Sequence, residues 1–334
     1  MNFSGSAKTL LLRYATPILF ILVFVYFGLS ADNFFSAANI LNIVKQASFV
    51  GVIAVGMTFV LLTAGIDLSV GSNMYISAMT VGYFLMLPGM QGTGGALLGI
   101  VVGLITGAVF GTVNAFFIVY LRIAPFLVTL ATMVAGHGLV TAITESFGID
   151  YPVAFTNLLA APILGIPVPI IIFALVVGGA HVIFTMTPFG RHLFAIGNNL
   201  EGAQKAGIAT DRIVFSVYVI SGFLAALGGI MLIAFVGRLN QTFGVGKEFD
   251  VITAAVLGGT SLFGGVGSAF GAVTGSVLVQ MVQAGMVFTK VNLYLQPIVL
   301  AGIIFLAVFV DSLRQNRVAR VRRHLIQIDP SKPD

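Results

Sequence analysis

The sequence predicts an all-α polytopic membrane protein with about ten transmembrane helices, two glycine-rich regions of broken or short helix, and one short helix outside the membrane. Of its 334 residues, 58% are apolar and only 8% are charged, and the mean hydropathy is +1.07. Soluble proteins carry roughly 25% charged residues, so the bilayer must be the solvent for most of this chain. At about 20 residues per span, residues 1–334 can form one transmembrane domain.

Composition also excludes several kinds of chemistry. The chain has no cysteine, which excludes disulfides, thiol catalysis and cysteine-ligated metals. The net charge of +5 is concentrated in the tail 312–334, directly after an apolar segment. Such juxtamembrane basic residues are typical of a cytoplasmic anchor on anionic lipid, not of nucleic-acid binding. The tail holds Arg314, Arg317, Arg320, Arg322 and Arg323.

Ten apolar segments are expected to cross the membrane. The first follows Lys8 and Arg13; we interpret it as a retained helix because further spans follow it, and not as a signal peptide. An even number of spans places both termini on one side. The expected spans are 12–30, 48–64, 72–87, 94–121, 124–145, 164–186, 213–236, 249–261, 268–288 and 294–311.

The distribution of basic residues orients the chain. If the termini are cytoplasmic, the same side receives Arg122, the segment 187–212 and the basic tail. The opposite side receives only four basic residues. The positive-inside rule therefore favours cytoplasmic termini. The four exceptions are Lys45, Arg238, Lys247 and Lys290.

Two similar polar interruptions stand out. The short spans 48–64 and 72–87 are joined by "AGIDLSVG", and the short span 249–261 runs into "LGGTSLFGGVGS". Each passes from an apolar stretch through glycine and hydroxyl residues to Val-Gly-Ser. Paired glycine-interrupted segments point to the pathway of a transporter.

The first interruption places Asp67 between apolar segments. Gly65 and Gly71 permit unusual backbone angles, and Ser69, Ser72 or Asp67 can cap a helix that starts near residue 70. Asp67 could instead contact a polar substrate or gate a path; we favour the cap. Other polar residues within spans either bond between helices or line a path for a neutral, hydroxyl-rich solute. They are Asn73, Asn114, Thr129, Thr132, His137, Thr141, His181, Ser216, Ser221, Thr253, Gln280 and Gln283.

The sequence gives little support for a metal site or for transport driven by an ion gradient. His137 and His181 are not at metal-ligand spacing. The spans offer two carboxylates, Asp67 and Asp250, each near a span end, whereas ion-coupled carriers usually hold several charged groups in the membrane. Energy is therefore expected from a partner protein.

The connector 189–213 suits such a partner. Asn198 and Glu201 form a variant capping box, and a helix over about 199–206 would pair Glu201 with Lys205 and end at Gly207. Its face of Leu200, Ala203 and Ala206, with Ile208 beyond, could dock into a groove on another protein. The alternative is an ordinary surface connector.

Three motifs carry a resemblance to a known family. "GIDLSVGS" (65–72), "FGRHLFAIGNNLEGAQKAGI" (189–208) and "VLGGTSLFGGVGS" (256–268) resemble signatures of the ribose-type permeases of bacterial ABC importers, in the same order and at similar spacing. The resemblance implies a permease subunit of a monosaccharide importer in the bacterial inner membrane. Its implied partners are a cytoplasmic ATPase, a periplasmic sugar-binding protein and a second permease chain, identical or related. No G-x-x-x-x-G-K-[ST] motif occurs, so the permease is expected to bind no ATP or other cofactor.

The resemblance and the residue patterns together give the candidate site residues. The resemblance itself assigns Gly197, Asn199, Gly207 and Ile208 to coupling, Gly65 to Ser72 to the first break, and Gly258, Gly259, Gly264, Gly265 and Gly267 to the second. Gly202 stands where the family usually has alanine, which should loosen the coupling helix by up to about 1 kcal/mol. The segment coupled to the ATPase would include Gly190, Gly197, Asn199, Leu200, Glu201, Ala203, Lys205, Gly207 and Ile208. The translocation path and its pivots would include Gly65, Asp67, Ser69, Gly71, Ser72, Asn73, Asn114, Gly258, Gly259, Thr260, Gly264 and Gly265.

Other functions remain as alternatives at this stage. An ion-coupled secondary carrier or a passive facilitator would share the spans but need no ATPase. An intramembrane enzyme lacks support, because the chain shows neither paired catalytic carboxylates nor clustered Ser, His and Asp. The sequence does not distinguish ribose from other pentoses, hexoses or polyols.

Overall fold

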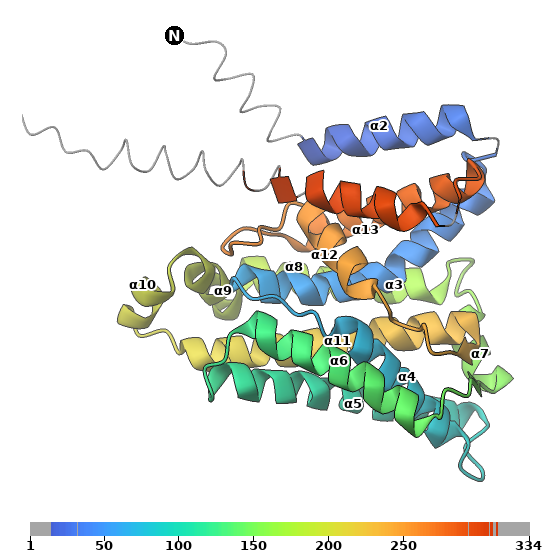
Figure 1. Ribbon diagram of the computed structural model, residues 1–334, viewed down its shortest axis with the longest axis horizontal. Coiled ribbons are helices and arrows are strands. Elements are labelled where there is room, and N and C mark those ends of the chain that lie inside the picture. Colours follow the sequence, from blue (N-terminus) through green and yellow to red (C-terminus); the bar gives the residue numbers. More distant parts are fainter. Residues whose placement is uncertain (1–14, 32, 293, 307, 310–311, 313–334) are drawn as a thin grey trace, which may run out of the picture.

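The computed structural model describes residues 15–31, 33–292, 294–306, 308–309 and 312 (Figure 1). The basic tail expected at 312–334 lies outside the described residues except for Ser312. Six described helices are long and apolar enough to cross a membrane. These are α3 (Ala37–Leu62), α5 (Thr93–Val119), α6 (Pro125–Ile143), α8 (Val168–Met186), α11 (Thr210–Val236) and α13 (Ala269–Phe288).

Shorter elements complete the fold. Residues Gln296–Leu306 form a further apolar helix, here called the last helix. The remaining elements are α2 (Ala15–Ser30), α4 (Val70–Leu85), β1 (Ile149–Asp150), α7 (Val153–Ala160), α9 (Pro188–Asn198), α10 (Leu200–Lys205), β2 (Arg238–Leu239) and α12 (Lys247–Leu257).

The sequence prediction of a short span at 48–64 is wrong. Helix α3 begins 11 residues earlier, at Ala37, where the Ser36 hydroxyl accepts a hydrogen bond from the Asn39 amide. The polar residues before 48 are inside the helix, and the Lys45 ammonium lies 4.3 Å from the centre of the Phe235 ring. A cation over the face of an aromatic ring is attracted to it, and this interaction explains why a lysine is tolerated inside α3.

The long helices lie side by side, and the short elements gather at their two ends (Figure 1). Helices α9 and α10 lie at one end, here called the α10 end. Helix α7 lies at the other, the α7 end. Because α3 runs from the α7 end to the α10 end, its last residues and the first break lie near α9.

Helix α11 is central and packs against α5, α3 and α4. Glycine recurs at every fourth residue of α5; this stripe faces α4 near its middle and α11 over its second half. A Cβ atom on Gly107 would overlap Ala226, and one on Gly111 would overlap the Tyr218 carbonyl oxygen. Small residues at this spacing let helix backbones approach closely in membranes. The opposite face of α5 exposes apolar side chains from Leu97 to Tyr120.

The α7 end is closed by a short hydrogen-bonded connection. Strands β1 and β2 pair antiparallel, with Asp150 and Arg238 3.4 Å apart as an exposed ion pair. The buried Tyr151 hydroxyl donates to the Ala78 carbonyl oxygen of α4 over 2.6 Å. Burial raises the pKa of Tyr151, so its phenol remains a neutral donor.

Candidate functional site

The first break joins α3 to α4 through residues 63–69. The Gly65 amide donates to the Val60 carbonyl oxygen over 3.2 Å, and Ala64 takes a left-handed conformation with φ of 59°. This is a common way to end a helix, although glycine usually occupies that position. The prediction that Gly65 and Gly71 supply the unusual backbone angles is wrong, because neither has a positive φ.

Gly65 and Gly71 instead allow close contacts. A Cβ atom on Gly65 would lie 2.5 Å from the Tyr218 hydroxyl. A Cβ on Gly71 would overlap the Gly244 carbonyl oxygen, because the segment before α12 touches the start of α4. Both glycines are therefore required by close packing, not by the backbone dihedral angles at these positions.

Asp67 is the centre of a buried hydrogen-bond network. Its Oδ1 accepts from the Ser69 amide over 3.0 Å and from the Ser69 hydroxyl over 2.6 Å. Its Oδ2 accepts from the Ser221 hydroxyl of α11 over 2.7 Å. Asp67 is only 1% exposed, so in this conformation it connects the break to α11 and does not face an open path.

The predicted capping role of Ser69 takes a different form. Ser69 precedes α4, but its side chain caps no amide of that helix; it donates to Asp67 and accepts from the Asn114 amide group over 2.7 Å. Asn114 in turn accepts from Thr132 of α6 over 2.8 Å. The chain of contacts therefore joins the break to α5 and α6. The Ser72 hydroxyl donates to the Ser69 carbonyl oxygen.

Asn73 connects three helices. Its amide nitrogen donates to the carbonyl oxygens of Gly107 and Gly222, over 3.2 and 3.1 Å. It therefore ties α4 to the close glycine contact between α5 and α11. Its amide oxygen accepts from Ser77. The structure gives Asn73 and Asn114 interhelical hydrogen bonds; lining of a path by these residues stays a prediction.

The second break, residues 258–268, contains several closely packed glycines. A Cβ on Gly258 would overlap the Gly271 carbonyl oxygen of α13. Gly264 has a φ of 88°, a left-handed value that favours glycine, and Gly259 and Gly265 share this geometry. In the described part of the chain, two buried side-chain atoms lack a hydrogen-bond partner, and there is one at each break: the hydroxyls of Tyr218 and Thr260.

The segment predicted to couple to an ATPase forms two helices. Asn199, not Asn198, caps α10: its side-chain oxygen accepts from the Gly202 amide over 2.9 Å. Asn198 instead ends α9, so the predicted Asn198–Glu201 capping box is wrong. Glu201 and Lys205 form an exposed ion pair of 2.7 Å.

The docking face predicted for α10 is only partly exposed. Leu200 and Ala206 are exposed, whereas Ala203 is buried and Ile208 is half-buried. Gly207 is left-handed, with φ of 78°, and ends the turn after α10. Gly190, at the start of α9, packs against the end of α8. An exposed leucine beside an exposed ion pair is available to a partner.

The end of α3 with the start of the first break, the end of α9 and the second break meet at one place, here called the junction: Leu62, Ala64, Gly197, Gly264 and Gly265. The Gly265 amide donates to the Leu62 carbonyl oxygen over 3.1 Å. A Cβ atom on Gly197 would overlap that same oxygen and the Gly265 amide nitrogen. The end of α9 therefore contacts the end of α3 and the second break mainly through backbone atoms, and the Asn198 side-chain amide donates to the Gly265 carbonyl oxygen over 3.4 Å.

One buried carboxylate, Glu248, was missed by sequence reasoning. Glu248 is 6% exposed, and a Cβ on Gly71 would lie 2.7 Å from its Oε2 atom. Its location between α12 and the start of α4 depends on the inward turn of residues 240–246, for which the sequence gives no periodic signal. The two histidines have local partners: His137 Nε2 lies 2.9 Å from the Gln241 carbonyl oxygen, and His181 packs on Phe270.

Comparison with known proteins identifies relatives over most of the chain. The family model described as the permease component of the branched-chain amino acid transport system matches residues 39–308. A ribose import permease protein of Haemophilus influenzae is 34% identical, with 90% of this chain and 94% of the relative covered. The D-allose transport system permease protein of Escherichia coli is 33% identical, with 89% and 90% covered.

A more distant relative is named for a third sugar. The xylose transport system permease protein of Escherichia coli is 29% identical, with 95% of both chains covered. No solved structure gives a significant match. The residues matched by the family model include both breaks and the α9–α10 segment.

Proposed function

Since this chain belongs to the permease component family of the branched-chain amino acid transport systems, we propose that it is the membrane subunit of an ATP-driven importer. Its solute is a monosaccharide or a similar small polar molecule, because the relatives matched over about nine-tenths of its length are sugar permeases. Neutral amides and hydroxyls dominate the polar groups inside the helices, which suits an uncharged solute.

The observation that carries the proposal is the junction. Leu200, Glu201 and Lys205 present an exposed surface on α10, and α9 reaches both breaks through Gly197. A partner that moves α9 and α10 would therefore displace both breaks together. This supports alternating access driven by an ATPase that binds at the α10 end and hydrolyses ATP itself.

The wider arrangement follows from this assignment. Ten helices would cross the bacterial inner membrane: the six long ones together with α2, α4, α12 and the last helix. The α10 end would be cytoplasmic, with both termini, because it carries Arg191, Lys205 and Arg212. A second permease chain, identical or related, would complete the path, and a periplasmic binding protein would deliver the sugar at the α7 end.

The test uses the full importer, in which the permease is co-expressed with its cognate ATPase and sugar-binding protein. The double variant Leu200→Asp and Glu201→Arg should lose ATPase co-purification and ATP-dependent uptake, because it replaces an apolar contact and reverses a charge on the exposed face of α10. Val153→Asp makes a matched change on α7, where Val153 is exposed, and should keep ATPase co-purification.

Two outcomes would contradict the proposal. Unchanged co-purification and uptake in the α10 variant would exclude docking at this surface. Uptake that survives ATP depletion but stops with an ionophore would identify an ion-coupled carrier instead.

A further inference from the structure

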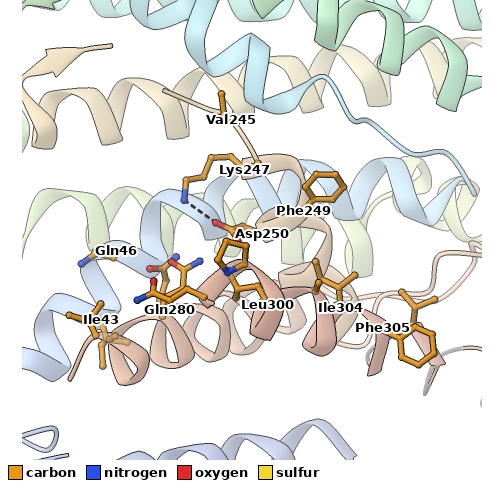
Figure 2. Close-up of a pocket in the computed structure, with 18 residues that line it drawn as sticks. Ile43, Gln46, Val245, Lys247, Phe249, Asp250, Gln280, Leu300, Ile304 and Phe305 are labelled. Atoms are coloured by element: carbon orange, nitrogen blue, oxygen red, sulfur yellow. Dashed lines mark hydrogen bonds and ion pairs between the residues drawn. The ribbon is translucent and has the colours of Figure 1, made fainter. Parts of the chain in front are cut away.

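A large cavity lies between α3, α12, α13 and the last helix (Figure 2). Its volume is about 950 Å³, within the range of about 300–1,000 Å³ typical of small-molecule sites. Its wall is mostly apolar, with Leu300, Ile304 and Phe305 of the last helix on one side (Figure 2). None of the residues predicted from the sequence motifs lines it.

Polar groups interrupt this wall near the middle of two spanning helices. Gln280 lies near the centre of α13, and Gln283 lies one turn further along. Gln46 lies about one turn before the centre of α3. Beside them, the Lys247 ammonium and an Asp250 carboxylate oxygen are 2.9 Å apart (Figure 2). We call Gln46, Gln280, Gln283, Lys247 and Asp250 the polar cluster.

The three glutamine amides have no hydrogen-bond partner among the described residues. Gln280 is only 5% exposed, so bulk solvent does not solvate it freely. Unpaired amides cost several kcal/mol in hydrocarbon. Water or a polar ligand in the cavity must therefore satisfy them, and an acyl chain would not.

A second, smaller cavity lies on the inner side of the cluster. It has a volume of about 50 Å³ and is lined by Gln46, Gln280, Gln283 and Lys247 together with Met74 of α4 and Leu232 of α11. A water molecule occupies about 30 Å³ in the liquid, so this space suits a water or two but not a solute. The solute site is therefore the large cavity, with the cluster as its inner wall.

We propose that the polar cluster and the cavity beside it form a binding site for a monosaccharide or similar polyol inside a single permease chain. Amides donate and accept hydrogen bonds, as sugar hydroxyls do, and the Lys247–Asp250 pair supplies one charged donor and one charged acceptor without net charge. The apolar wall and the Phe249 ring face the C–H surfaces of the sugar. This inference rests on the proposed function and adds a binding station within the chain.

The test exploits the absence of cysteine from the chain. Gln283→Cys introduces a single thiol at the cavity, and Gln91→Cys introduces one in the exposed connector between α4 and α5. Both are labelled with a small methanethiosulfonate reagent in the assembled importer, with and without D-ribose, D-allose or D-xylose. A transported sugar at about ten times its Kd should slow labelling of Gln283→Cys about tenfold and leave Gln91→Cys unchanged.

Uptake kinetics provide a second readout. Gln280→Leu and Gln283→Leu should raise the KM for uptake about threefold to tenfold by removing hydrogen bonds, while ATPase co-purification is retained. Gln91→Leu should change neither. Normal membrane insertion of each variant is checked by its yield after purification.

The outcomes separate this site from the proposed function. If the wild-type importer takes up one of the sugars but that sugar does not protect Gln283→Cys, the site is wrong and the proposed function stands. Failure to label Gln283→Cys at all would also overturn the site, because the cavity would then be closed or filled by lipid. If wild-type uptake does not depend on ATP and no sugar protects the thiol, both proposals fall.

Discussion

Asp67 accepts three hydrogen bonds at the first break, so the three donors around it determine what a substitution would cost. In Asp67→Asn, the side-chain oxygen can keep both bonds from Ser69, and the Ser221 hydroxyl can rotate to accept from the new amide. We expect the free energy of unfolding to change by less than about 1 kcal/mol and uptake to continue. Thermal unfolding in detergent and uptake assays measure these effects.

Asp67→Leu is the matched contrast. It leaves Ser69 and Ser221 without their acceptor, which should cost about 1–3 kcal/mol for each buried donor left unpaired. A well-folded Asp67→Asn variant that has lost uptake would show that the charge itself is required. Asp67 would then be a functional group and not a connector.

A substitution at Ala64 is expected to raise stability, whereas Asp67→Leu is expected to lower it. Its left-handed conformation costs a residue with a Cβ atom about 1–2 kcal/mol, part of which glycine loses again through the freedom of its unfolded chain. Ala64→Gly should therefore stabilise the protein by up to about 1 kcal/mol, measured as a higher unfolding temperature. Ala54→Gly, inside α3, the helix that ends just before Ala64, should lower stability by about 1 kcal/mol. A destabilising Ala64→Gly would show that the Ala64 methyl group, which packs near Gly264, contributes more than the strain costs.

At the scale of single residues, the sequence predicts only interactions between residues that are close in the chain. Asp67 and Ser69 are two residues apart, so their interaction follows from the motif itself. Ser221 is 154 residues from Asp67 and Asn114 is 45 residues from Ser69. These bonds depend on helix packing, which sequence periodicity does not specify. The participation of Asp67, Asn73 and Asn114 in polar contacts was predictable, whereas the choice of partners was not.

At the scale of elements, Gly197 is the point where α9 reaches both breaks. Gly197→Val should force α9 away from Leu62 and Gly265, because its side chain would occupy the space of their backbone atoms. Overpacking of this kind costs about 1–3 kcal/mol. We expect ATPase co-purification to persist and uptake to fall, since α10 stays exposed while its connection to the breaks is altered.

Gly178→Val is the control for this experiment. Gly178 lies on α8 with no heavy atom within 4 Å of its Cβ position, so the same substitution should be tolerated. Uptake and ATPase stimulation are measured for both variants in proteoliposomes. Wild-type uptake by Gly197→Val would exclude the junction as the route from the ATPase to the breaks.

The elements themselves were predicted unevenly. The helix after residue 199 was predictable because its ion pair and its terminal glycine are local signals, although its cap was predicted one residue too early, at Asn198. The start of α3 was not predictable, because Lys45 and Gln46 are polar residues typical of loops. Their partners, the Phe235 ring and the large cavity, are visible only in the folded structure. The glycine stripe of α5 is present in the sequence at regular spacing, and it could have indicated the close contact with α11.

At the scale of the whole molecule, two sets of contacts connect elements that are distant in the sequence. Asn73 and the glycine stripe hold α4, α5 and α11 together. The junction connects α9 with α3 and the second break. Both sets of contacts reach the first break, which joins α3 to α4, and the Asp67–Ser221 bond connects that break to α11. The six long apolar helices were predictable from hydropathy, but these connections depend on contacts between distant helices.

The exposed apolar face of α5 has a consequence for the surrounding lipid. From Leu97 to Tyr120 it extends about 35 Å at 1.5 Å per residue, more than the hydrocarbon thickness of about 30 Å. A tilt of about 30° would fit this face to the bilayer, and α4 and α11 would tilt with it. Thinner bilayers would require a greater tilt of the whole group. Lipid chain length should therefore change the tilt of these helices and, through it, the rate of uptake. Uptake rates in vesicles of graded acyl-chain length would measure this effect.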